Sequence, residues 1–173
     1  MVSHSRTPRL LVTVSRAAKA PAAPTARTLT KLFMRALELA QQSRRLQRIC
    51  AKRWVVDVHI VTDAHIASLN TRHLKVRGPT DVLAFTMGEL DPERRALNLG
   101  EIVVSFETAR REAGKRGIAI EEELGRYCLH GFLHLLGHED NSRTARQAMF
   151  LVQEKALGLP RRTSARNPLD WGG

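Results

Sequence analysis

Residues 100–137, GEIVVSFETARREAGKRGIAIEEELGRYCLHGFLHLLG, change from a strand-like to a helix-like pattern within a few positions. The first seven residues, GEIVVSF, are rich in β-branched side chains and predict a strand. Residues 107–116 predict a short helix, which Gly117 can end as a left-handed cap. Glu121–Glu123 then open a second helix, where the helix dipole favours negative charge. We expect this second helix to continue to Gly137.

The residues before this stretch predict three further strands and two helices. The strands are expected at Leu10–Val14, Trp54–Thr62 and Thr80–Met87. Between the first two strands, apolar residues at helical spacing predict a helix that ends near Ala40 and begins at Thr28 or Thr30, since either threonine can cap it. Asp63 is expected to cap a short helix that runs through Asn70.

Strands come early in the chain and most helices come late, with a last helix predicted over Ser142–Leu157. This order predicts an α+β fold in one domain, a mixed four-stranded sheet surrounded by about five helices. The length of 173 residues is sufficient for one domain with a sizeable core. We expect this domain to span residues 1–160, with a basic N-terminal portion at residues 1–53, and residues 161–173 to form a flexible tail.

Basic residues exceed acidic residues by 28 to 17, so the formal net charge is +11. Residues 1–53 contain twelve Lys or Arg and one acid, Glu38, and therefore hold all of this excess. Cations that neutralise phosphates release condensed counterions, so this distribution favours a polyanionic partner such as nucleic acid. A basic surface that is merely solvated would have the same charge.

Two features limit the class of protein. The chain has no run of about 18 uncharged apolar residues, which excludes a membrane-spanning helix and a membrane partner. It has two cysteines, Cys50 and Cys128, too few for a disulfide-stabilised secreted scaffold or a cysteine-rich zinc site. We therefore expect a soluble protein in the reducing cytoplasm.

The segment LHGFLHLLGHEDN, residues 129–141, has the spacing of a metal site. His130 and His134 are four residues apart on a predicted helix, so both imidazoles lie on one face and can chelate one cation. Gly137 lets the chain turn back. The residues that can then complete the coordination are His138, Glu139 and Asp140. Packed helix histidines that hydrogen-bond locally are the alternative, but the glycine turn and the acidic end favour a metal.

Zinc suits such a set because imidazole nitrogen and carboxylate oxygen both bind it, and three protein ligands leave a fourth position for water. The pKa of that water falls towards about 7, and the cation can polarise a carbonyl or phosphoryl oxygen. Gly131 occupies the position at which HExxH zincin proteases have their general base. We expect His130, His134 and Glu139 to act in catalysis. His138 and the metal-bound hydroxide are alternative candidates for the base.

Three blocks of the sequence, in order, resemble the YbeY family of bacterial ribosomal RNA maturation endoribonucleases. They are LN…PTDVLAF at Leu69–Phe85, LGEIVVSFETA at Leu99–Ala109 and HGFLHLLGHED at His130–Asp140, and the resemblance covers roughly residues 54–157. It implies a mixed four-stranded sheet with a metal-binding helix facing a cleft beside it. It also implies zinc-dependent, single-strand-specific cleavage of ribosomal RNA, with roles in 16S rRNA 3′-end maturation and ribosome quality control. The implied partners are ribosomal RNA and the ribosome or its small subunit.

The family pattern HxxxHxxxxxH implies one zinc ion per chain, held by His130, His134 and the residue ten positions after the first histidine, which is Asp140 here. An Asp ligand is chemically adequate, because carboxylate oxygen binds zinc at nearly the same distance as imidazole nitrogen. His138, eight positions after the first histidine, is the competing third ligand. Such a site also accepts other divalent ions.

A second departure from the family concerns an arginine that faces the catalytic cleft in many members. The corresponding position is Leu74 here. Nearby cations in the basic loop at residues 71–79 can take its place on the phosphate, namely Arg72, Lys75 and Arg77. The alternative is that this loop is simply exposed and basic.

Two other functions remain open at this point. One is a metal-dependent hydrolase of another bond, such as a metallopeptidase. The other is a non-enzymatic ribosome assembly factor with structural zinc, which a closed site with four protein ligands would favour.

Overall fold

The computed structural model describes residues 8–17, 20, 23–40, 52–93 and 95–158. Over these residues the chain forms four strands and five helices. In chain order they are β1 (Arg9–Arg16), α1 (Ala26–Leu39), β2 (Arg53–Val61), α3 (Asp63–Leu74), β3 (Val82–Asp91), β4 (Ala96–Ser105), α4 (Phe106–Arg116), α5 (Ile120–Leu135) and α6 (Arg143–Leu157). Among the described residues, no helix is both long and apolar enough to cross a membrane. Cys50 and the expected tail at residues 161–173 lie outside the described residues, and the expected basic portion at residues 1–53 is described only in part.

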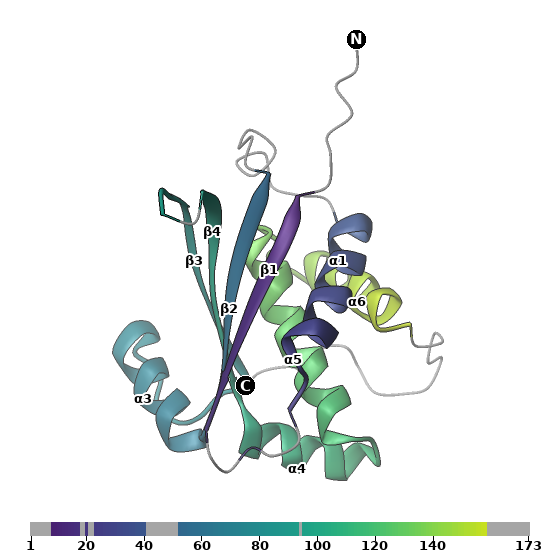
Figure 1. Cartoon of the computed structure of the whole chain (residues 1–173). Coiled ribbons are helices and arrows are strands. Elements are labelled where there is room, and N and C mark those ends of the chain that lie inside the picture. The colour runs from purple at the N-terminus through teal and green to yellow at the C-terminus, as the bar shows by residue number, and fades with distance from the viewer. Residues whose placement is uncertain (1–7, 18–19, 21–22, 41–51, 94, 159–173) are drawn as a thin grey trace.

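The strands form one mixed sheet in the order β1-β2-β4-β3 (Figure 1). β1, β2 and β4 are parallel, and β3 pairs antiparallel with β4 as a hairpin. Parallel neighbours need crossover connections, and α1 lies on the connection between β1 and β2. The predicted α+β fold with a mixed four-stranded sheet is confirmed.

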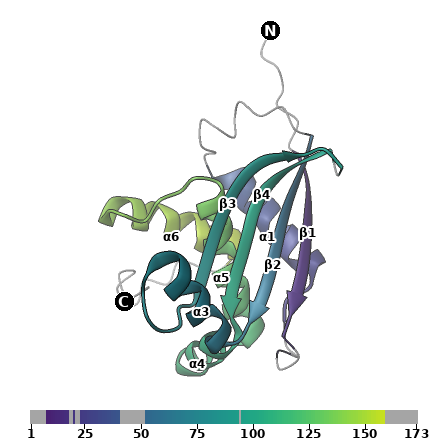
Figure 2. The same ribbon diagram turned by 90° about the vertical axis from the view of Figure 1, so that its left-hand side faces the viewer.

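The helices cover the two faces of the sheet unequally. α1, α5 and α6 pack together on one face, and α3 lies against the other face at its β3 and β4 side (Figure 2). The larger core lies under the three helices and includes a stacked pair, Phe33 of α1 and Phe132 of α5, with ring centroids 4.3 Å apart. A smaller cluster of Ile66, Leu83 and Val103 holds α3 to the sheet.

Two helices begin at other residues than we expected. α1 begins at Ala26, because the hydroxyl of Thr25 accepts a hydrogen bond from the Thr28 amide and caps the helix. α3 is capped by Thr62 rather than Asp63, and it continues four residues beyond Asn70 to Leu74. The first part of the expected basic loop is therefore helical. The strands also differ from their predicted bounds by a few residues, since pairing with neighbours extends them.

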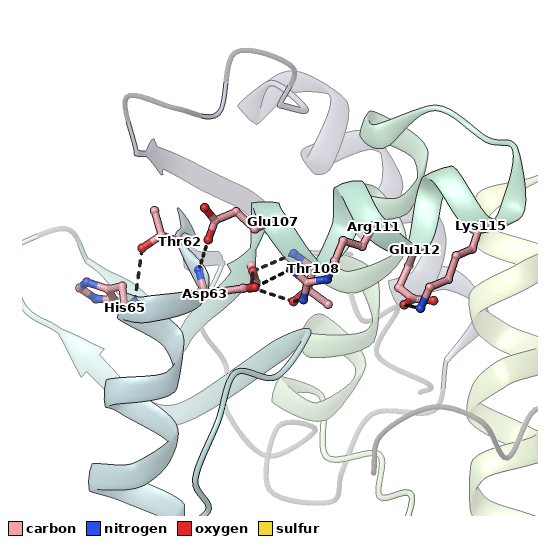
Figure 3. A network of polar contacts seen from close by, with 9 residues as sticks. Thr62, Asp63, His65, Glu107, Thr108, Arg111, Glu112 and Lys115 are labelled. Atoms are coloured by element: carbon pink, nitrogen blue, oxygen red, sulfur yellow. Dashed lines mark hydrogen bonds and ion pairs between the residues drawn. The ribbon is translucent and has the colours of Figure 1, made fainter.

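Asp63 has a different role from the one predicted (Figure 3). Its carboxylate accepts hydrogen bonds from Ser105 and Thr108 at the start of α4, and it forms an ion pair with Arg111 at 2.6 Å. In return, a carboxylate oxygen of Glu107 accepts a hydrogen bond of 2.7 Å from the Asp63 amide. These contacts run in both directions and tie α3 and α4 together at the carboxyl ends of β2 and β4, while Ser105 itself caps α4 by accepting from the Thr108 amide.

α5 lies on β3 and β4 and packs closely against the sheet at Gly131. A Cβ atom at this position would lie 2.7 Å from Cγ2 of Ile102 and 3.1 Å from Cγ2 of Val82. Both distances are below ordinary van der Waals contact, so only glycine fits without displacing the sheet. This packing determines which face of α5 points away from the sheet.

Candidate metal centre

The imidazoles of His130 and His134 lie together on α5. Their Nε2 atoms are 3.2 Å apart, and the two rings are nearly perpendicular, with an interplanar angle of 84°. The separation of four residues produces this proximity directly, since side chains four apart on a helix are neighbours. Both nitrogens can therefore bind a single cation.

The turn after α5 brings Asp140 to these histidines. Gly137 has a φ of +91°, in the left-handed region, and the His138 amide donates to the Leu133 carbonyl at 3.0 Å. Nη1 of Arg146 on α6 then donates to the main-chain oxygen of Asp140 at 2.8 Å. These contacts place Oδ2 of Asp140 at 3.9 Å and 3.8 Å from the Nε2 atoms of His130 and His134.

The three ligand atoms have the spacing that a small divalent ion requires. Two ligands of tetrahedral zinc, bound at about 2.0–2.1 Å, lie about 3.3–3.4 Å from each other. The distances between the Nε2 atoms and Oδ2 here, 3.2 to 3.9 Å, are close to this value. The side chains of His130, His134 and Asp140 are 22%, 29% and 48% exposed, so the group faces solvent. Residues of this kind and spacing can hold a metal ion.

The other ring nitrogen of each histidine has its own contact. Nδ1 of His134 donates to the His138 carbonyl at 3.0 Å, and since a carbonyl only accepts, Nε2 keeps its lone pair. Nδ1 of His130 lies 3.3 Å from Oε1 of Gln153 on α6. Burial and the neighbouring His134 lower the pKa of His130, which favours the neutral imidazole that metals bind.

The structure brings Asp140, and not the two other proposed third ligands, to the histidine pair. His138 contributes its carbonyl to the orientation of His134, and its side chain is not in the three-residue group. Glu139 is exposed, and its Oε2 accepts a hydrogen bond from Nδ2 of Asn141 at 2.6 Å. Cys128 precedes His130 by two residues in α5 but is buried, and burial raises the pKa of its thiol to about 12.

The three predicted RNA-binding cations lie at the end of α3 and just after it. Arg72 is in the last turn, Lys75 ends the helix in the left-handed conformation, and Arg77 follows in the loop, all exposed. Nζ of Lys75 donates to the Arg72 carbonyl at 3.1 Å. Leu74, at the position of the family arginine, is 57% exposed.

This basic loop leads from α3 to the strand beneath the metal centre. Nδ2 of Asn70 donates to the Gly78 carbonyl at 3.1 Å and holds the loop against the helix. Asp81 follows, and its charge is near enough to His130 to oppose the lowering of the histidine pKa. Val82, the first residue of β3, lies beneath Gly131 of α5. The loop and the metal centre are therefore connected through the start of β3.

The sequence did not predict the contact between Gln153 and His130. Gln153 lies 23 residues after His130 on a separate helix, and no local pattern relates the two positions. Its position in α6 marks it only as one member of an amphipathic helix. The packing of α6 on α5 is needed to place it beside the metal centre.

The fold and this site define an α+β protein with a solvent-facing pair of histidines and a carboxylate suited to a divalent metal. A family model described as "Endoribonuclease YbeY" matches residues 16–159, most of the chain. The chain belongs to the YbeY family, as its three sequence blocks indicated.

Individual relatives agree with this assignment. Proteins named endoribonuclease YbeY are 38% identical over 106 residues in Pelotomaculum thermopropionicum and 41% identical over 106 residues in a Synechococcus strain. These alignments cover 60% and 58% of this chain, and 70% and 63% of the relatives. A third, from Halalkalibacterium halodurans, is 32% identical over 69% of this chain and 80% of its own length. A solution structure of a Thermotoga maritima protein aligns with 86% of this chain and 89% of its own, with 25% identity and a TM-score of 0.49.

Proposed function

We propose that this chain is a zinc-dependent endoribonuclease that cleaves single-stranded ribosomal RNA, in 16S rRNA 3′-end maturation and ribosome quality control. The observation that carries the proposal is the convergence of two imidazole nitrogens and one carboxylate oxygen on a solvent-facing site. Membership of a family whose members are named endoribonucleases supports the reaction class. We propose a cytoplasmic location, where ribosomes are made.

In this mechanism, His130, His134 and Asp140 hold the metal. A divalent ion there supplies Lewis acidity and lowers the pKa of a bound water, which suits hydrolysis of a phosphodiester. The neutral histidines present their Nε2 lone pairs, because their Nδ1 atoms face oxygen acceptors. Glu139 has an exposed carboxylate next to Asp140 in the chain, and we assign it the uptake of the proton that the attacking water loses.

RNA binding is assigned to the cations of the basic loop, Arg72, Lys75 and Arg77, together with the basic N-terminal portion. Exposed cations suit contact with a phosphate backbone. Few aromatic side chains are available for base stacking, since Phe, Trp and Tyr make up 5% of the chain and Trp54 is buried in the core. We therefore expect contacts to the backbone to dominate over readout of sequence.

Two observations count against the other functions. A peptidase of the HExxH type needs a glutamate at position 131, where even a Cβ would contact Ile102 at 2.7 Å. A structural zinc site would be closed by four protein ligands, whereas the described residues supply a group of three that is partly exposed. Neither alternative therefore ranks above the nuclease.

The test replaces ligands and measures metal content and cleavage together. His134→Ala and Asp140→Ala should lose both bound zinc and cleavage of a single-stranded rRNA fragment, because two remaining ligands hold the ion poorly. Asp140→His should keep both, since imidazole is also a good zinc ligand. His65→Ala, on the exposed side of α3, is the control and should behave as the wild type.

Three outcomes would contradict the proposal. Full cleavage by Asp140→Ala would exclude that residue as a ligand. A wild-type protein that binds zinc and cuts peptides but not RNA would be a peptidase. A wild-type protein that binds zinc and cuts neither would fit an assembly factor.

A further inference from the structure

Gln153 is buried between α5 and α6, with 3% of its surface exposed, and its Oε1 lies 3.3 Å from Nδ1 of His130. We infer that Gln153 is a positioning residue that selects the ring orientation and tautomer of His130 and thereby sets the affinity of the metal centre. This inference rests on the proposed metal site, and it assigns a role to a side chain outside the ligand set.

The chemistry follows from which atom of the Gln153 amide faces the ring. If Oε1 faces Nδ1, the nitrogen carries the proton and Nε2 has a free lone pair directed towards His134 and Asp140. If the amide nitrogen faced the ring instead, Nδ1 would accept and the proton would sit on Nε2, where it blocks a cation. The tautomer of His130 is therefore tied to the orientation of one amide.

The two histidines differ in this respect. His134 donates to a main-chain carbonyl, which offers no donor and so allows one tautomer only. His130 instead faces a side chain that can accept or donate. The orientation of the Gln153 amide can therefore vary. A substitution at Gln153 changes the tautomer of His130 without replacing any metal ligand.

The neighbourhood of Gln153 holds its position. The next residue, Glu154, forms an ion pair with Arg126 of α5, and both side chains are largely buried. Arg126 also reaches Glu122 at 3.3 Å, one turn earlier on α5. On the other side of Gln153, Met149 packs in the core. α6 is therefore anchored to α5 on both sides of the contact with His130.

The experiment compares two substitutions that differ in one property. Gln153→Met keeps the length of the side chain but removes the acceptor, and Gln153→Glu keeps an acceptor and removes the donor. Zinc affinity of the full chain is measured by competition with a chelating dye. We expect Gln153→Met to bind zinc about 10–100-fold more weakly and Gln153→Glu to stay within about threefold of the wild type, as for other partners of metal-bound histidines. Gln147→Met, exposed on the same helix, is the matched control and should leave the affinity unchanged.

A second measurement needs neither RNA nor a variant. ¹⁵N NMR of the histidine rings in the zinc-loaded wild type should show the Nδ1 proton of His130 as a slowly exchanging signal, because Gln153 accepts it. This readout keeps the inference separate from the proposed function: the expected proton exchange and affinities in a protein that does not cleave RNA would overturn the nuclease and leave the role of Gln153 intact.

The role of Gln153 would be overturned by any of three results. The first is wild-type zinc affinity in Gln153→Met. The second is an equal loss in Gln153→Met and Gln153→Glu, which would show a packing role only. The third is fast solvent exchange of the His130 Nδ1 proton in the zinc-loaded wild type, which also decides the matter if Gln153→Met does not fold.

Discussion

Gly131 lies between the two histidines of the candidate centre in the chain and packs tightly against the sheet. Its absent side chain lets α5 approach Ile102 and Val82. The same glycine that departs from the zincin pattern is therefore required by packing. A glutamate at this position has no room.

The packing at Gly131 can be tested by adding one methyl group. Gly131→Ala should destabilise the fold by about 1–3 kcal/mol, because the added Cβ overlaps the β-branched side chain of buried Ile102. Urea unfolding measures the change as a lower midpoint. The effect should appear even though alanine favours helices over glycine by about 1 kcal/mol.

Gly114 of α4 is the matched control, since a Cβ there would meet nothing within 4 Å. Gly114→Ala should raise the stability by up to about 1 kcal/mol, the helix propensity difference alone. An equal response of the two variants would show that the contact with Ile102 does not limit position 131.

At the scale of elements, the reciprocal hydrogen bonds between α3 and α4 join two parts of the chain that meet only in the folded state. Asp63 and Glu107 each accept hydrogen bonds from the start of the other helix (Figure 3). Burial opposes ionisation of Asp63, but hydrogen bonds from Ser105, Arg111 and Thr108 outweigh it and hold the pKa of Asp63 below its usual value of 3.8.

This lowered pKa predicts a pH dependence of stability. The unfolded state binds the proton more tightly than the folded state, so stability from Asp63 is present above pH 3.8 and is lost as the pH falls towards the lowered pKa. Asp63→Asn should cost about 1–2 kcal/mol at neutral pH, from the weakened hydrogen bonds with Ser105 and Thr108 and the lost ion pair with Arg111. Its free energy of unfolding should then depend less on pH in the acid range than that of the wild type.

Glu112 offers a control on the same helix. It forms an exposed ion pair with Lys115 at 2.7 Å, three residues along α4 (Figure 3). Surface pairs of this kind contribute little, about 0–1 kcal/mol. Glu112→Gln should therefore change the stability much less than Asp63→Asn does, and a reversed ranking would contradict the role of Asp63 in joining α3 to α4.

On the scale of the whole molecule, positive charge gathers at one end of the sheet. Arg9 and Arg53 are the first residues of β1 and β2 and are paired in the sheet. Lys52 directly precedes Arg53 in the chain. All three are exposed, and within the described ranges no acidic partner of theirs is observed. Like charges opposite each other on a sheet are unfavourable, so their arrangement suits an external polyanion.

The salt dependence of RNA binding tests this arrangement. Replacing Arg9, Lys52 and Arg53 together with glutamine should lower the slope of log affinity against log salt by about 2, since each contact to a single strand contributes about 0.7. The basic loop predicts a similar loss for Arg72, Lys75 and Arg77. Binding is measured on the His134→Ala background, so that the RNA stays intact.

A third triple substitution removes three positive charges from a different part of the surface. Arg27, Lys31 and Arg35 line a groove between α1 and α5 together with the acids Glu121 and Glu122, which screen them. Replacing these three with glutamine should change the slope less than the other two triples do. Equal effects of all three would show that net charge, and not its placement, drives binding.

Sequence by itself determined the features that depend on neighbours along the chain. The spacing of four between His130 and His134, the turn at Gly137 and the strand-like pattern of residues 100–106 are local, and local geometry follows from helix and strand periods. The α+β class and the family blocks could be predicted for the same reason. The caps were harder, because adjacent threonines and acids compete for one role, and Thr62 took the position expected for Asp63.

Tertiary structure alone decided which residues meet across the fold. The strand order β1-β2-β4-β3, the fit of Gly131 on Ile102 and the contact of Gln153 with His130 join residues on different elements. No period along the chain relates these positions, because their distances are set by how α5 and α6 pack on the sheet and not by the backbone between them.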